Sequence, residues 1–253
     1  DGTHFLMKAG HAKKGVIAIK VVNDKLAKKL QEATEGYQNI EVVTVPDAYP
    51  MGWERVLIRE LFKKEYDRFP GEIGIIVNNA TTAIYLSEAL RDKKPITHRI
   101  VTISGEGVKN PENVYVPIGT SVDYIIEKIG GYTDNVNEMF VLGGGPMMGK
   151  SIANDTFVVT TYSNSITILP KLVEEELPCL RCGLCIEHCP AKIQPVQIMN
   201  LEKQKNTEGV IEARADKCIT CGLCTYICPS KIEVTDWVGK AKTRVANARK
   251  AGK

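Results

Sequence analysis

The first ninety residues alternate short apolar runs with stretches in which apolar residues recur at helical spacing. Short apolar runs predict buried strands, and the helical spacing predicts amphipathic helices. In chain order, the pattern predicts a strand at 15–21, a helix at about 24–33, a strand at 40–45, a helix at 53–66, a strand at 74–78 and a helix at 81–91. This alternation is typical of an α/β fold with a parallel sheet, whose binding loops follow the carboxyl ends of the strands.

The pattern changes after His98. We expect strands at 99–104 and 113–118, a short helix at 121–129, and a strand at 139–142 that runs into a glycine-rich loop ending at Gly149. This strand-strand-helix-strand order resembles a β-grasp module. The loop by itself is weak evidence for a ligand site, because glycine clusters are also ordinary turn signals.

Composition narrows the class of protein. A chain of 253 residues with 43% hydrophobic and 25% charged residues is not typical of disordered, collagen-like or coiled-coil proteins, and no segment offers the roughly 18 to 20 apolar residues of a membrane helix. Residues 1–178 carry 20 Lys and Arg against 23 Asp and Glu, whereas residues 179–253 carry 13 against 7. We interpret the basic segment first as compensation for an anionic metal centre and second as a docking surface.

All eight cysteines lie in two runs at an offset of 39 residues. Each run reads C-x-x-C-x-x-C-x-x-x-C-P, the spacing of bacterial ferredoxins that hold four-iron clusters. Three sulfurs on a loop kept open by Gly183 or Gly222 can face one cluster, and the fourth faces the other cluster. The expected ligand sets are Cys179, Cys182, Cys185 and Cys228 for one [4Fe-4S] cluster, and Cys218, Cys221, Cys224 and Cys189 for the second.

Other interpretations of the cysteines fit less well. Four disulfides are typical of small secreted scaffolds, and tight C-x-x-C repeats have poor disulfide geometry. Zinc ribbons need two cysteines per knuckle instead of runs of four that end in proline. His188 lies inside the first run, where the second run has Ile227, so we expect a surface side chain and not a ligand.

Two loops of the α/β segment are candidate binding sites because they follow predicted strands. One contains Tyr49, Gly52 and Glu54, and the other runs from Asn78 to Thr82. Asn79 or Thr81 could simply cap the next helix, and Glu54 suits a first helical turn. The chain has no G-x-G-x-x-G or P-loop motif.

The cysteine runs, the α/β body and the segment Gly144-Gly-Pro-Met-Met-Gly149 together resemble the C subunit of the Rnf ion-translocating electron transport complex. The body also resembles the NADH- and FMN-binding subunit of respiratory complex I. The resemblance implies a Rossmann-like parallel-sheet domain at 1–96, a β-grasp (SLBB-type) domain at 97–172 and a C-terminal α-helical bacterial-type 2[4Fe-4S] ferredoxin domain at 173–253. It also implies an oxidoreductase that passes electrons between NAD(H), FMN and two [4Fe-4S] clusters, with NAD(H) as the substrate.

The resemblance extends to individual residues. Tyr49, Gly52 and Glu54 fall where the complex I relatives have Tyr and Gly-Glu-Glu beside the flavin, with Trp53 in place of the first Glu. The segment Val77-Asn78-Asn79-Ala-Thr-Thr82 matches their Val-Asn-Asn-x-x-Thr loop. The implied flavin contacts are Tyr49, Gly52, Glu54, Val77, Asn78, Asn79 and Thr82.

One family motif has no counterpart in this sequence, namely a glycine-rich flavin loop followed by lysine. The start Asp1-Gly2-Thr3-His4 lacks a methionine or an apolar leader, which predicts that the chain is a fragment of a longer protein beginning after that loop. The alternative is a homologue that has lost flavin and NADH binding and serves as an electron relay.

The resemblance also implies partners and a location. We expect other subunits of an Rnf-type membrane complex, with a ferredoxin-like electron partner, and a cytoplasmic position on the inner face of the cell membrane. An alternative is an electron-transfer adaptor for a soluble reductase of the proline or cobalamin type. A third class is an iron-sulfur structural or nucleic-acid protein that uses the basic end 239–253. We expect no nucleic-acid partner, because that end is more simply a solvated helix and the body lacks an aromatic stacking stripe.

Overall fold

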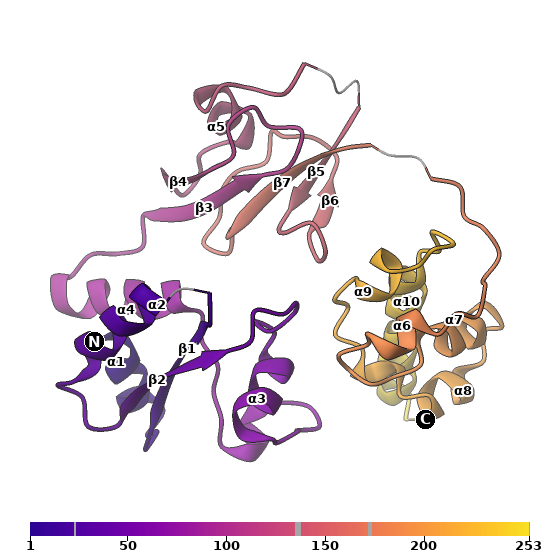
Figure 1. The fold of residues 1–253 in the computed structure, drawn as a ribbon, viewed down its shortest axis with the longest axis horizontal. Coiled ribbons are helices and arrows are strands. Elements are labelled where there is room, and N and C mark those ends of the chain that lie inside the picture. Colours follow the sequence, from indigo (N-terminus) through magenta and orange to yellow (C-terminus); the bar gives the residue numbers. More distant parts are fainter. Residues whose placement is uncertain (23, 135–137, 172–173, 253) are drawn as a thin grey trace. The chain divides into compact units, whose positions relative to one another are not determined.

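The computed structural model describes residues 1–22, 24–134, 138–171 and 174–252 (Figure 1). The chain divides into two compact units, Asp1–Ile96 and Thr97–Lys253. The expected boundary between a β-grasp and a ferredoxin domain, at 172–173, lies outside the described residues. Each unit is described below by itself.

The first unit is an α/β fold around a parallel pair of strands. Its elements are α1 (Gly2–Ala9), β1 (Gly15–Lys20), α2 (Asp24–Thr34), β2 (Ile40–Val45), α3 (Glu54–Phe62), the 3-10 helix η1 (Pro70–Ile73) and α4 (Ala80–Asp92). β1 and β2 pair in parallel, with Gly15 opposite Ile40 and Lys20 opposite Val45. The helix α2 between them packs on β2, as a β-α-β connection requires. The predicted order strand, helix, strand, helix from β1 to α3 is confirmed, and so is the helix α4.

The prediction of a strand at 74–78 is wrong. Among the described residues of this unit, only β1 and β2 form a sheet. The segment follows η1, where Gly74 has a φ of 71° and closes that short helix. Ile76 is 67% exposed, so this apolar run is not buried on either side. An apolar run of five residues predicts burial, but it does not supply the neighbouring strand that burial needs.

The helix α1 was not predicted from the sequence. It packs against α4, and Gly2 makes the close approach possible, because a Cβ atom at this position would lie 1.8 Å from the carbonyl oxygen of Ala83. Gly15 is similar, because a Cβ there would meet the Met7 sulfur at 2.7 Å. Two glycines therefore set how closely α1 lies on the rest of the unit.

The second unit begins with a five-stranded sheet. Its elements are β3 (His98–Ser104), β4 (Glu112–Pro117), α5 (Val122–Lys128), β5 (Met139–Gly143), β6 (Lys150–Ile152) and β7 (Ser165–Pro170). The strand order is β4-β3-β7-β5-β6, with β3 and β7 parallel and the other pairs antiparallel. Residues from α5 and from the inner face of the sheet form one core, including Val101, Ile103, Val122, Ile126 and Ile166.

The expected strand-strand-helix-strand order is present, but the sequence pattern missed β6 and β7. β7 is the central strand of the sheet. It lies in an uncharged stretch rich in Ser and Thr, and Thr167 is buried there because its hydroxyl donates a hydrogen bond to the Gly144 carbonyl (2.8 Å). A central strand that buries hydroxyl groups does not show the usual apolar pattern.

The cysteine-bearing part of the second unit is helical and has its own core. Its elements are α6 (Leu184–Glu187), α7 (Pro195–Lys203), α8 (Thr207–Glu212), the 3-10 helix η2 (Ala215–Lys217), α9 (Leu223–Tyr226) and α10 (Val234–Lys250). Ile198, Val210, Val234, Val238 and Val245 are fully buried between α7, α8 and α10. Within the described parts of the chain, no helix combines the length and the apolar character needed to span a membrane.

Candidate metal centre and flavin loops

The repeat of the cysteine runs extends to the backbone. The helices α6 and α9 begin 39 residues apart, and so do α7 and α10. Gly183 and Gly222 precede α6 and α9 with φ values of 81° and 84°. These angles lie in the left-handed region, which glycine adopts without steric cost. The expectation that these two glycines hold the cysteine loops open is confirmed.

Backbone amides point at equivalent sulfurs in the two runs. The N–H of Arg181 donates to Cys179 Sγ (3.4 Å), and the N–H of Thr220 donates to Cys218 Sγ (3.3 Å). Arg181 and Thr220 both have positive φ values, which turn these amides toward the preceding cysteine. Hydrogen bonds from N–H groups stabilise a thiolate, the form in which cysteine binds metal. Both loops therefore have the local structure that a thiolate ligand needs.

Four cysteines from both runs surround one small cavity. Cys189 comes from the end of the first run, and Cys218, Cys221 and Cys224 come from the second. They line a cavity of about 20 Å³ together with apolar side chains such as Ile219 and Val238. The structure thus brings together the four residues expected to hold one cluster.

The four cysteines expected to hold the other cluster lie nearer the surface. Cys179 and Cys182 are exposed, whereas Cys185 and Cys228 are half-buried. The Ser230 hydroxyl donates to the Pro178 carbonyl (2.9 Å), and the Leu177 N–H donates to the Ser230 carbonyl (3.0 Å). These two bonds hold the segment after Cys228 against the start of the first run.

The donor set, two groups of four cysteine sulfurs, fits two four-iron clusters. None of the eight cysteines forms a disulfide. Among the described residues, no three or more Cys, His, Asp or Glu side chains close around one ion. In a cubane cluster each sulfur binds a different iron, so its ligands stand farther apart than the ligands of one zinc ion. His188 is exposed, with Nδ1 3.1 Å from the Leu184 carbonyl, which agrees with a surface residue.

Burial sets the protonation of the thiols. Desolvation raises the pKa of Cys224 to about 11 and also raises the pKa of Cys218, Cys221 and Cys185. Because the ligand form is the thiolate, metal binding must release protons from these groups. Lys242 offers a compensating cation: its Nζ donates to the Cys218 carbonyl (2.6 Å) and favours the thiolate of that residue.

The first candidate flavin loop leads into α3. Tyr49 and Gly52 are exposed, and the bond from Tyr49 to Pro50 is cis. Glu54, the first residue of α3, accepts a hydrogen bond from the Tyr66 hydroxyl. Burial, followed by this bond, raises the pKa of Tyr66 to about 12. The Arg55 guanidinium lies 4.0 Å from the centre of the Tyr66 ring and donates to the backbone carbonyls of residues 66 and 67. These contacts hold the first turn of α3 in place.

The second candidate loop leads into α4. Asn79 is the N-cap, and its Oδ1 accepts from the Thr81 N–H (2.9 Å) and the Thr81 hydroxyl (2.7 Å). Its role as a cap is therefore confirmed. Asn78 and Thr82 are exposed, and Val77 is half-buried. In Figure 1, α3 and α4 lie on different sides of β1 and β2.

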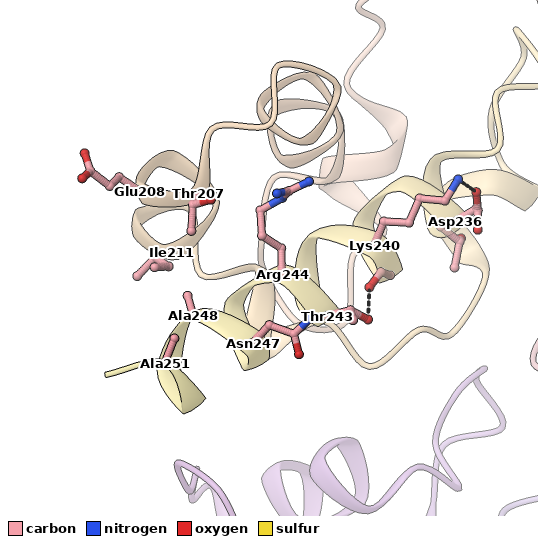
Figure 2. A pocket seen from close by; sticks show the side chains of 12 residues that line it. Thr207, Glu208, Ile211, Asp236, Lys240, Thr243, Arg244, Asn247, Ala248 and Ala251 are labelled. Atoms are coloured by element: carbon pink, nitrogen blue, oxygen red, sulfur yellow. Dashed lines mark hydrogen bonds and ion pairs between the residues drawn. The ribbon is translucent and has the colours of Figure 1, made fainter. Parts of the chain in front are cut away.

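A larger hollow of about 1250 Å³ lies between α8 and α10 and contains no cysteine (Figure 2). Basic side chains of α10 lie in or near it and are paired with acids. Lys240 binds Asp236 (2.7 Å), and Arg244 makes two 2.7 Å bonds to the buried Glu202. Farther along the helix, Arg249 binds Asp216 (2.9 Å).

Sequence analysis missed the polar side chains that support the cysteine loops, namely Thr225, Ser230, Thr235 and Lys242. Comparing the two runs beyond their cysteines could have found two of them. At the offset of 39, Thr225 and Thr235 correspond to Ile186 and Val196, so hydroxyl groups replace apolar side chains beside one cluster only.

Comparison with known proteins defines the class first. Residues 1–88 match the Nuo51 FMN-binding domain, residues 100–151 the SLBB domain and residues 178–232 the 4Fe-4S dicluster domain. The chain is thus a flavin and iron-sulfur protein of the electron-transfer type. The expected fold classes and the expected cofactors, FMN and two [4Fe-4S] clusters, are confirmed.

Three relatives show which proteins the chain is similar to along most of its length. The chain is 31% identical over 203 residues to the C subunit of the ion-translocating oxidoreductase complex of Yersinia enterocolitica, a match that covers 78% of this chain and 29% of that protein. It is 32% identical over 199 residues to the C subunit of the proton-translocating ferredoxin:NAD(+) oxidoreductase complex of Clostridium ljungdahlii (77% of this chain, 43% of that protein). The C subunit of the Rhodobacter capsulatus ion-translocating oxidoreductase complex is 32% identical over 205 residues (78% and 39%). The chain is a homologue of these C subunits and spans less than half their length.

Proposed function

We propose that this chain passes single electrons between a flavin and a protein partner through two [4Fe-4S] clusters with crossed ligands. Cys179, Cys182, Cys185 and Cys228 hold one cluster, and Cys218, Cys221, Cys224 and Cys189 hold the other. The observation that carries the proposal is the cavity lined by Cys189 together with the first three cysteines of the second run. When bound, the clusters supply one-electron chemistry, and the chain supplies ligands, amide donors and a largely apolar wall.

The test is anaerobic reconstitution with iron and sulfide, followed by iron analysis and EPR after reduction with dithionite. We expect about eight irons and two interacting centres per chain. Bound zinc, or only four irons, would contradict two clusters.

Two matched variants test whether each cluster takes its fourth ligand from the other cysteine run. Cys228→Ala should damage the more exposed cluster, and Cys189→Ala should damage the buried one. Because each variant removes the last cysteine of one run, ligation within a single run predicts the opposite assignment. The centres are told apart by measuring how fast a chelator removes the remaining iron, since Cys179 and Cys182 are exposed and Cys221 is buried.

We further propose that FMN binds the first unit through Tyr49, Gly52, Glu54, Val77, Asn78, Asn79 and Thr82, and that NAD(H) exchanges hydride with it. Support comes from the FMN-binding domain match and from the exposed residues Asn78, Asn79 and Thr82 at the start of α4, because a helix N-terminus favours a phosphate. Flavin fluorescence quenching on titration tests this. Asn78→Ala should weaken FMN binding, whereas Ser87→Ala, on the same helix outside the loop, should not. Equal affinity of both variants would refute a flavin contact from Asn78, and no binding by a chain with upstream residues would favour the relay without flavin.

We propose that the chain works within an ion-translocating membrane complex, held at the inner face by other subunits. Support comes from the names of the C-subunit relatives. In the native host, the protein should sediment with membranes and leave them in high salt or when the membrane subunits are deleted. Recovery with a soluble reductase instead would support the adaptor alternative.

A further inference from the structure

The two halves of the cysteine repeat supply a hydrogen-bond donor to the third cysteine in different ways. In the first half, the Val196 N–H, in the first turn of α7, donates to the Cys185 sulfur. In the second half, the corresponding N–H of Thr235 donates to the Thr225 hydroxyl oxygen instead (2.9 Å). The Thr235 hydroxyl oxygen then lies 3.2 Å from Cys224 Sγ. A side chain has thus taken the place of a backbone amide.

The direction of each hydrogen bond in this group follows from simple donor rules. A backbone N–H can only donate, so the Thr225 oxygen accepts from Thr235. The Thr225 hydroxyl hydrogen then points to the Thr235 oxygen, 3.0 Å away. A ligating cysteine is a thiolate and has no hydrogen to give. The Thr235 hydroxyl hydrogen is therefore directed at Cys224 Sγ.

We propose that Thr235, oriented by Thr225, is a positioning residue that tunes the reduction potential of the cluster held by Cys218, Cys221, Cys224 and Cys189, and leaves the other cluster unaffected. This inference rests on the proposed function, since it requires Cys224 to be a cluster ligand. Reduction adds a negative charge to the cluster and its thiolates, so a donor to sulfur stabilises the reduced state more than the oxidised state. The hydroxyl therefore raises the potential of this cluster.

The surroundings strengthen the effect of this one bond. Thr235 and Cys224 both line the small cavity with Val238 and Ile219, and the low polarity there increases electrostatic interactions. In the first half, Ile186 and Val196 occupy the corresponding positions, so a substitution of Thr235 has no counterpart at the other cluster.

The experiment is an EPR-monitored redox titration of the fully loaded chain. Thr235→Val keeps the side-chain shape but removes the hydroxyl. It should lower the equilibrium constant for one-electron reduction of one cluster by about tenfold, which corresponds to about 59 mV. Thr235→Ser should retain the wild-type reduction potential of this cluster. Thr243→Val is the matched control, because Thr243 lies on the same helix and donates only to the Gly239 carbonyl (3.1 Å; Figure 2).

A double variant tests the role of Thr225. Thr225→Val alone should change the potential little, because the amide of residue 235 is released to donate to the sulfur and compensates for the lost orientation of the Thr235 hydroxyl. Thr225→Val combined with Thr235→Val should recover most of the lost potential through the same released amide, as Val196 does in the first half. A double variant as low as Thr235→Val would refute the idea that Thr225 holds this amide away from the sulfur.

Iron analysis separates failure of the inference from failure of the proposed function. If wild-type chains do not reach about eight irons, the cluster assignment itself is refuted. If all variants carry eight irons but Thr235→Val moves neither potential, or moves both equally, the tuning role is refuted. A second readout is resonance Raman spectroscopy in D₂O, where the shift of the iron-thiolate bands should be smaller in Thr235→Val than in wild type, because only the amide donors to sulfur then remain.

Discussion

The bond between Glu202 and Arg244 should stabilise the helical cysteine-bearing part more than any surface ion pair there. The Glu202 side chain is 8% exposed, and both its oxygens accept from Arg244 at 2.7 Å. Arg244→Met leaves the carboxylate buried without a cation. Losing one partner of a fully buried pair costs roughly 3 to 5 kcal/mol. Because the Arg244 side chain is 30% exposed, water can replace part of the interaction, and we expect a loss of about 2 to 3 kcal/mol.

Urea unfolding followed by far-UV circular dichroism measures this loss under anaerobic conditions. The matched control is Arg249→Met, because Arg249 binds Asp216 from a side chain that is 55% exposed. Loss of an exposed pair of this kind should lower the free energy of unfolding by less than about 1 kcal/mol. Glu202→Met combined with Arg244→Met should recover much of the stability, since both charges are then gone. Equal losses for Arg244→Met and Arg249→Met would refute the reasoning.

Three further outcomes follow from other contacts. Hydrogen bonds from the N–H groups of Phe69, Asp67 and Arg68 lower the pKa of Glu72 in the folded state. The ionised Glu72 therefore stabilises the first unit above the ordinary Glu pKa of about 4.3, and this contribution is lost as the pH falls through the lower pKa of the folded state. Glu72→Gln should make the free energy of unfolding depend less on pH in the acid range. Gly2→Ala should displace α1 from α4, seen as faster amide exchange in both helices; unchanged exchange would contradict the close packing. Lys242→Met should speed iron loss to a chelator, because the Cys218 loop loses its 2.6 Å tie to α10, whereas Lys240→Met should not.

The cysteine-bearing part was the most predictable from sequence because covalent spacing limits its geometry. Cysteines at i, i+3 and i+6 around a glycine allow few loops that present three sulfurs to one centre, and both observed loops use Gly183 or Gly222 as expected. A comparison of the two runs could have marked Thr235 as a difference between them, but not its contact with Cys224, which depends on where α10 begins relative to α9.

The sheet regions were less predictable because strand pairing is not local. The run at 74–78 has strand-like residues but no partner strand, whereas β7 mixes hydroxyl residues with the buried Ile166 and Ile168 and lies at the centre of a sheet. In the first unit, the residue pattern found α3 and α4, but it does not say how the loops that precede them lie in space. The flavin contacts of Tyr49 and Asn78 therefore stay predictions.

The central position of β7 also determines when the sheet can form during synthesis. β3 pairs on one side with β4, which follows it closely, but on the other side with β7, so that Thr102 lies opposite Ser165. Until the ribosome has released residues up to Pro170, both β3 and β5 have an open edge, and unpaired strand edges promote association between chains. β1 and β2 can pair as soon as Val45 has emerged. A nascent chain stalled before residue 165 should therefore contain a paired first sheet beside an incomplete, aggregation-prone second one.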